Sequence, residues 1–165
     1  MTTAVVVGNP RPESRTLRAA TYVAEQLTGT APHVVADLAT VGPALLDPAD
    51  PDVTDLVTQV GAADLVVVAS PTYKGAYTGM LKVFLDRFAG GSGLSGVAVP
   101  LMLGASPGHA LAPELTLRPV LTEIGGTVPG RGLYVLDSTH DEPAAYADWI
   151  AAIRPVVTAL LEARR

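Results

Sequence analysis

The stretch Asp64–Asp86, "DLVVVASPTYKGAYTGMLKVFLD", joins a predicted strand to a predicted helix through a polar turn. Its first part, Asp64–Ser70, is apolar without alternation, which is typical of a strand buried on both faces of a parallel sheet. The residues Tyr77–Phe88 then show the spacing of apolar side chains that predicts a helix. The stretch is therefore one strand–turn–helix unit, and the rest of the chain repeats this order.

Four further strands and four further helices are predicted from the same kinds of pattern. The strands are Ala4–Val7, His33–Asp37, Gly96–Leu103 and Gly132–Asp137. The helices are Ser14–Leu27 with Ser14 as N-cap, Val53–Val60, Gly108–Ile124 with a kink at Pro119, and Pro143–Arg164 with a bend at Pro155. A loop rich in Pro and Asp is expected at Leu38–Asp52, and Pro100 is awkward in a central strand. Five strands alternating with five helices predict one α/β domain over residues 1–165, built on a doubly wound parallel sheet.

Composition excludes several classes of function. The 165 residues contain no cysteine, so disulfides, thiolate nucleophiles and cysteine-based metal sites are excluded. The net charge is −5 and only two lysines occur, which argues against nucleic-acid binding. No apolar stretch of membrane-spanning length or signal peptide is expected, and a reducing cytoplasm suits the composition.

Ligands of doubly wound sheets bind beyond the carboxyl ends of the strands. Three loops at these ends are rich in small and polar residues: "GNPRPESRT" (8–16), "SPTYKGAYTG" (70–79) and "GASPGHA" (104–110). The first loop precedes a helix N-terminus and supplies the side chains of Asn9, Arg11, Ser14 and Thr16, a donor set suited to a phosphate. It matches neither G-x-G-x-x-G nor G-x-x-x-x-G-K-[ST], and a plain helix-capping turn remains an alternative.

The second loop suits a flat heterocycle. Pro71 and Gly75 shape a turn, and Tyr73 and Tyr77 offer rings beside it. A phosphate on one loop and a flat ring on the next describe a mononucleotide with a long spacer, and flavin mononucleotide (FMN) fits that description.

The first two loops also resemble a known family. "GNPRPESRT" is similar to the G-S-x-R-x-x-S-x-T phosphate loop of the flavodoxin-like NAD(P)H-dependent FMN reductases, with Asn9 in place of the usual Ser. "SPTYKGAYTGMLKVFLD" is similar to the S-P-x-Y-x-G-x-Y-x-G-x-L-K-x-x-L-D segment of that family, and the chain most resembles the FMN reductases of alkanesulfonate monooxygenase systems. The resemblance implies strand order 2-1-3-4-5, FMN, NADPH or NADH as donor, and a homodimer or homotetramer.

The resemblance also assigns cofactor-binding residues. Asn9, Arg11, Ser14, Arg15 and Thr16 are implied to hold the FMN phosphate. The implied ring contacts are Pro71, Thr72, Tyr73, Lys74 and Gly75 along one edge and Gly104, Ala105 and Ser106 at the other.

Hydride transfer between stacked rings requires alignment more than an acid or a base. No catalytic side chain and no metal ligand is therefore assigned, and His109 is interpreted as a surface residue. The resemblance implies a flavin reductase that supplies reduced FMN to a partner monooxygenase. An FMN-bound quinone or azo reductase and a flavodoxin-type electron carrier are the alternatives.

Overall fold

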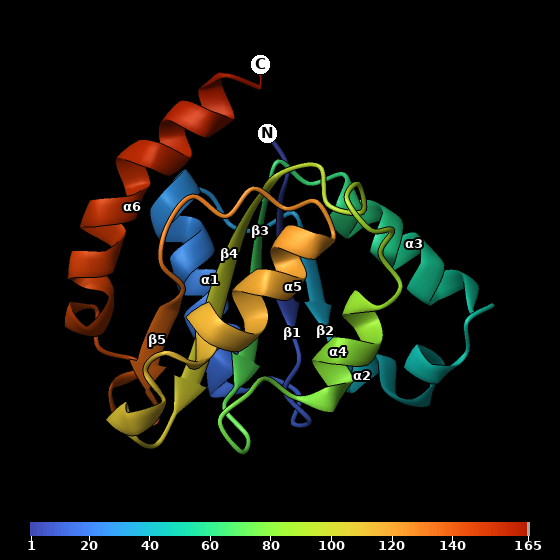
Figure 1. Ribbon diagram of the computed structural model, residues 1–165, viewed down its shortest axis with the longest axis horizontal. Helices are drawn as coiled ribbons and strands as arrows, with labels where there is room; N and C mark the ends of the chain where they lie inside the picture. The colour runs from blue at the N-terminus through green and yellow to red at the C-terminus, as the bar shows by residue number, and fades with distance from the viewer. Residues whose placement is uncertain (165) are drawn as a thin grey trace.

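The computed structural model describes residues 1–164, which form a five-stranded parallel sheet with helices on both faces (Figure 1). The strands lie in the order β2-β1-β3-β4-β5, and every neighbouring pair is parallel. This confirms the predicted fold class and strand order. The strands are β1 (Thr3–Val7), β2 (Val34–Asp37), β3 (Leu65–Pro71), β4 (Val97–Gly104) and β5 (Leu133–Leu136).

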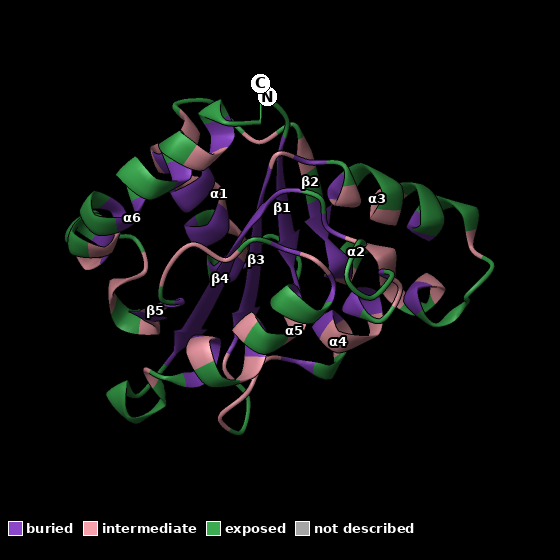
Figure 2. Ribbon diagram, turned by 45° about the horizontal axis from the view of Figure 1, so that its top comes forward, coloured by how far each residue is buried: buried purple, intermediate pink, exposed green. Residues whose placement is uncertain are grey.

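Alternation along the strands divides the core into two layers. Val5 and Val7 of β1 face α1 (Arg15–Thr28) and α6 (Ala144–Glu162), which cover one face of the sheet. Ala4 and Val6 face the other side, where α3 (Pro51–Gly61), α4 (Gly79–Leu85) and α5 (Arg118–Glu123) pack. Figure 2 shows the strands as the buried centre of the molecule. Because both faces are covered, the strands are continuously apolar, as the sequence indicated.

Three predicted segments differ from the structure, and two of them lie at Leu38–Asp52 and Tyr77–Phe88. The expected loop Leu38–Asp52 contains a short helix, α2 (Leu38–Val41), a 3₁₀ helix, η1 (Gly42–Leu46), and the start of α3. Leu38 and Leu45 are buried in the core, so tertiary packing orders a segment whose prolines and aspartates indicated a loop. The helix predicted at Tyr77–Phe88 is shorter: α4 begins after its N-cap Thr78 and ends at Leu85, before the C-cap Asp86.

The helix predicted at Gly108–Ile124 is broken into three pieces. They are a 3₁₀ turn, η2 (Pro107–His109), a π-helical turn, η3 (Pro113–Leu117), and α5. Pro119 lacks the N–H group that an α-helix would donate to the carbonyl of Leu115. Just before it the helix widens, and the amide of Arg118 bonds to the carbonyl of Pro113, five residues back. The expected disruption is therefore a change of helix type rather than a simple kink.

Pro100 is tolerated in β4 because of the sheet register. The amide of Ala98 donates to Thr127, and pairing with β5 begins only at Leu101. Pro100 falls between these two contacts, so its missing N–H costs no ladder hydrogen bond with β5.

α6 is 19 residues long, and its most apolar 18-residue window has a mean hydropathy of 1.3. By length and composition alone it could cross a membrane, so the expectation that no segment has this character does not hold for α6. One such helix is a weak indication, and α6 packs on the sheet through buried side chains on one face: Tyr146, Ile150, Ile153, Val157 and Leu161.

Candidate functional site

The first loop is held in shape by its own side chains. The Asn9 amide donates through Nδ2 to Thr16 Oγ1 at 3.0 Å, and its Oδ1 accepts the Arg11 amide at 3.0 Å. Ser14 is the N-cap of α1, as predicted, and its Oγ accepts the Leu17 amide at 3.2 Å. The loop therefore leads directly into a 14-residue helix, whose first-turn amides and dipole favour an anion.

A buried carboxylate supports this loop from behind. Glu13 has a φ of +52°, in the left-handed region that non-glycine residues rarely adopt. Its amide donates to Oδ2 of Asp37 at 2.9 Å, at the carboxyl end of β2. The other carboxylate oxygen, Asp37 Oδ1, is buried without a hydrogen-bond partner among residues 1–164. Asp37 thus fixes the strained residue at the centre of the loop.

The second loop ends in a tight turn. The amides and carbonyls of Tyr73 and Ala76 bond to each other at 2.8 and 3.1 Å. Lys74 and Gly75 between them have φ values of +54° and +80°, as a type I′ turn requires. The turn predicted at Gly75 is confirmed. Its tip is exposed, and the Tyr73 side chain retains 53% of its accessible surface.

A buried hydroxyl network connects the second loop to the first. Thr78 Oγ1 donates to the carbonyl of Gly8 at 2.5 Å and caps α4 by accepting the amide of Leu81 at 3.2 Å. The amide of Thr78 donates to Ser70 Oγ at 3.0 Å, at the end of β3. Gly8 must be a glycine, because a Cβ there would lie 2.4 Å from Leu81 Cβ. The two loops are therefore fixed relative to each other at their roots.

The third loop is tied to the site by Tyr134 of β5. The Tyr134 hydroxyl donates to the carbonyl of Ser106 at 2.7 Å. Burial is the largest cause that raises the pKa of Tyr134 above its usual value, so the hydroxyl stays protonated and keeps donating at neutral pH. A Cβ on Gly104 would lie 2.2 Å from this hydroxyl and 3.2 Å from Thr72 Cβ, so only glycine fits between the two loops.

One cavity of about 480 Å³ gathers all five of the residues predicted for the first loop. It is lined by Asn9, Arg11, Ser14, Arg15 and Thr16 together with Pro71 and Tyr73, and also by Pro12, Glu13, Arg18 and Asp137. Thr72, Lys74, Gly75, Gly104, Ala105 and Ser106 do not line it. They lie on the adjoining second and third loops at the same edge of the sheet.

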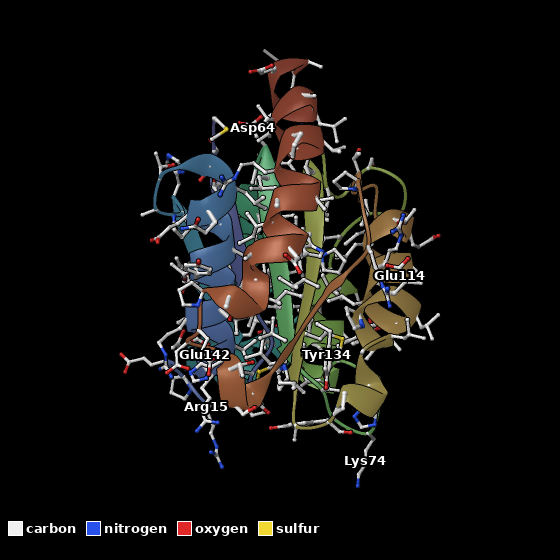
Figure 3. The ribbon with its side chains drawn as sticks, turned by 90° about the vertical axis from the view of Figure 1, so that its left-hand side faces the viewer. Arg15, Asp64, Lys74, Glu114, Tyr134 and Glu142 are labelled. Atoms are coloured by element: carbon white, nitrogen blue, oxygen red, sulfur yellow. The ribbon has the colours of Figure 1, made fainter. Side chains whose placement is uncertain are left out.

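Figure 3 shows this edge from the side of α6. Arg15 and Lys74 project beyond the carboxyl ends of the strands, and Tyr134 and Glu142 lie near the same edge, whereas Asp64 lies at the opposite one. Ala105–His109 is exposed, and among residues 1–164 no group of three or more His, Asp or Glu side chains has the arrangement of a metal site.

Sequence reasoning missed the residues that hold the loops. Asp37 ends β2, Ser70 and Tyr134 lie within β3 and β5, and Thr78 precedes α4; no motif marks Asp37 or Tyr134. Ser70 is the first residue of the segment that resembles the family motif, and Thr78 had a local signal, since a threonine directly before the helical run "GMLKVFL" is a typical N-cap.

Comparison with known proteins agrees with this geometry. A family model described as NADPH-dependent FMN reductase matches residues 1–141. The FMN reductase (NADPH) of Escherichia coli K12 is 32% identical over 137 residues, which cover 81% of this chain and 72% of that protein. The FMN reductase (NADPH) of Pseudomonas putida KT2440 is 31% identical over 98 residues, or 59% of this chain and 48% of that protein. The crystal structure of an NADH:FMN oxidoreductase in its apo form superposes with a TM-score of 0.85 at 28% identity, covering 96% of this chain and 89% of that one.

Proposed function

The chain belongs to the NADPH-dependent FMN reductase family, and on that premise we propose that it binds FMN along the carboxyl edge of its sheet, with the phosphate in the 480 Å³ cavity. The family reaction is the reduction of FMN by NADPH. The observation that carries the placement is the convergence of Arg11, Arg15 and the α1 N-terminus on one cavity beside the Tyr73 turn.

The donor set fits the FMN phosphate. A phosphate monoester presents several oxygens, and the guanidinium of Arg11 offers two parallel donors to them. Arg11 and Arg15 are both exposed at the cavity, so their side chains are free to turn toward a ligand. The side chains of Asn9 and Thr16 are hydrogen-bonded to each other, so they hold the loop in shape and also line the cavity.

The second and third loops fit the edge of the isoalloxazine ring. The exposed tip of the Tyr73–Ala76 turn presents the amides of Lys74 and Gly75, because the amides of Tyr73 and Ala76 are already bonded within the turn. On the third loop, Ala105 and Ser106 follow Gly104, where Tyr134 and Thr72 leave no room for a side chain. Bound FMN supplies the hydride acceptor, and these loops orient its ring for the nicotinamide.

No side chain is proposed as an acid or base. His109 is exposed on η2, and the Lys82 ammonium pairs with Asp86 at 2.5 Å on α4. Alignment of the two rings then determines the rate of transfer.

We further propose that reduced FMN leaves the site for a partner flavin-dependent monooxygenase in the cytoplasm. The turn tip at Tyr73 and the Ala105–His109 segment are exposed, so the flavin edge would be held at the surface rather than enclosed. An open site favours exchange of the flavin.

We also propose that the protein is a homodimer or homotetramer. A groove of about 510 Å³ separates α4 from α5, and its walls are largely apolar: Leu85, Phe88, Pro119, Val120 and Ile124. Leu111 and Leu115, which precede α5 in the chain, are 49% and 67% exposed. Leu117, Leu121 and Ile124 of the same segment are instead buried in the core. Sedimentation that shows only monomer at micromolar concentration would contradict this proposal.

Steady-state assays test the function. NADPH and NADH are each supplied as donor while free FMN is varied against a quinone. We expect saturable dependence on added FMN with NADPH as donor. If the rate is independent of added FMN and a quinone or azo dye is reduced through flavin that stays bound, the protein is a quinone or azo reductase instead of a flavin reductase.

A further inference from the structure

A second, smaller cavity lies next to the phosphate cavity, between α1 and the segment that precedes α6. It has a volume of about 150 Å³. Its walls are the rings of Tyr22, Tyr146 and Pro143, and its rim carries Arg18, His140 and Asp141. We call it the α1–α6 pocket. The rings of Tyr22 and Tyr146 meet edge to face, with centroids 4.9 Å apart.

Arg18 lines both cavities. Its guanidinium donates through Nη1 to the carbonyl of Glu13 at 3.3 Å and through Nη2 to His140 Nε2 at 3.2 Å. Arg18 lies one turn beyond the N-terminus of α1, and the two cavities adjoin at its side chain. A ligand that begins in the phosphate cavity can therefore reach the α1–α6 pocket past Arg18.

Two hydrogen bonds position the ring of His140. His140 Nδ1 lies 2.9 Å from the carbonyl of Asp137, which can only accept, so Nδ1 carries the proton. Nε2 is then the acceptor for Arg18. The guanidinium keeps its full positive charge at the mouth of the pocket, and no carboxylate is bonded to it among residues 1–164.

The phosphate cavity is lined by more guanidinium groups than carboxylates. Three arginines, Arg11, Arg15 and Arg18, line the phosphate cavity beside two carboxylates, Glu13 and Asp137. Arg18 is the one of the three that also lines the α1–α6 pocket, so its guanidinium is placed to pair with a second, linked phosphate. The second phosphate is expected beside Arg18, at the entrance of the aromatic pocket.

From these features we propose that the α1–α6 pocket binds the adenosine of a 5′-adenylate group that is joined through a pyrophosphate to the part of the ligand held in the site. The proposal rests on the proposed function. A cavity of about 150 Å³ with apolar walls accepts an aromatic ring, and the face of Tyr22 offers a surface on which a base can stack. Both FAD and NADPH contain this group, whereas FMN and reduced nicotinamide mononucleotide lack it.

Two variants of Tyr22 test the pocket. Tyr22→Leu removes the aromatic surface, and Tyr22→Phe keeps it as the matched control. Tyr22 makes no side-chain hydrogen bond in the described part of the chain, so the phenylalanine variant should behave like the wild type. Melting temperatures of all three proteins establish that they are folded.

Two pairs of probes distinguish the sources of the adenylate. Dissociation constants are measured for FAD and FMN, and KM values for NADPH and reduced nicotinamide mononucleotide. Loss of one stacking contact is expected to weaken binding roughly tenfold. If Tyr22→Leu weakens FAD but leaves FMN within twofold, the flavin supplies the adenylate. If it raises KM for NADPH but not for the mononucleotide, the nicotinamide cofactor supplies it.

Other outcomes overturn the proposal. They are equal effects of Tyr22→Leu on both members of each pair, no effect on either pair, or the same loss in Tyr22→Phe. The proposed function itself fails only if the wild-type protein does not bind FMN or does not reduce it with NADPH. The two failures are therefore distinguishable.

Discussion

Replacing Thr78 with valine tests whether the first two loops are mechanically joined. Valine keeps the shape of threonine but has no hydroxyl, so the contacts of Oγ1 with Gly8 and with the Leu81 amide are both lost. Loss of an N-cap costs about 1 kcal/mol. A buried carbonyl left without its donor costs roughly 1–3 kcal/mol. The free energy of unfolding should therefore fall by about 2–4 kcal/mol, which for a chain of this size lowers the melting temperature by roughly 5–15 °C.

Thr58→Val is the matched control. The Thr58 hydroxyl donates to the carbonyl of Thr54 on the exposed side of α3, so its loss should change stability by less than about 0.5 kcal/mol. Unfolding in urea gives both stabilities, and quenching of flavin fluorescence gives FMN affinity. Because Gly8 begins the phosphate loop, Thr78→Val should also weaken FMN. Equal stability of the two variants, or unchanged FMN affinity in Thr78→Val, would refute the reasoning.

Four further changes test single parts of the site. Arg11→Ala should weaken FMN by roughly 1.5–3 kcal/mol, the scale of a charged hydrogen bond, and calorimetric titration with unchanged affinity would mean that the loop only caps α1. Tyr134→Phe releases the carbonyl of Ser106 and should raise the dissociation constant of FMN up to about tenfold with a stability loss near 1 kcal/mol; a tighter complex would contradict this. His109→Ala should leave hydride transfer within about tenfold in stopped-flow reduction, and a hundredfold loss would reveal an acid–base role. Burial is the main cause that raises the pKa of Tyr146 to about 12. The unfolded state therefore releases this proton first, and stability should fall as pH rises from about 10 to 12; Tyr146→Phe should remove that part of the pH dependence.

Much of the fold could be predicted because each strand carries its own signal. Residues 65–71 are buried along their whole length, and a run of this kind is typical of a central parallel strand. The predicted ends of α1 and its Ser14 cap are close to the observed ones for the same local reason. The segment after β2 was mispredicted because its order depends on distant partners. Arg87, for example, donates to the carbonyls of Asp47 and Pro48.

The sequence predicted those residues of the candidate site that can contact a ligand, but not the residues that hold them in place. Motif spacing singles out Arg11 and Gly75, but it carries no information on what holds them. Asp37 supports the first loop from a strand 24 residues away, and Tyr134 supports the third loop from 28 residues away. A hydrogen bond between distant segments leaves no periodic pattern, so these residues are visible only in three dimensions.

The way the three loops are anchored indicates how ligands exchange. The first and second loops are joined by hydroxyls that are almost fully buried, Ser70 and Thr78, so opening this side would expose unpaired groups of the core. The third loop is exposed from Ala105 to His109, and its connection to β5 is the hydroxyl of Tyr134. A single hydrogen bond of this kind contributes about 1 kcal/mol, which thermal motion breaks readily. In the proposed site, we therefore expect the phosphate side to be rigid and the edge formed by the third loop to be the one that opens to admit and release a flavin.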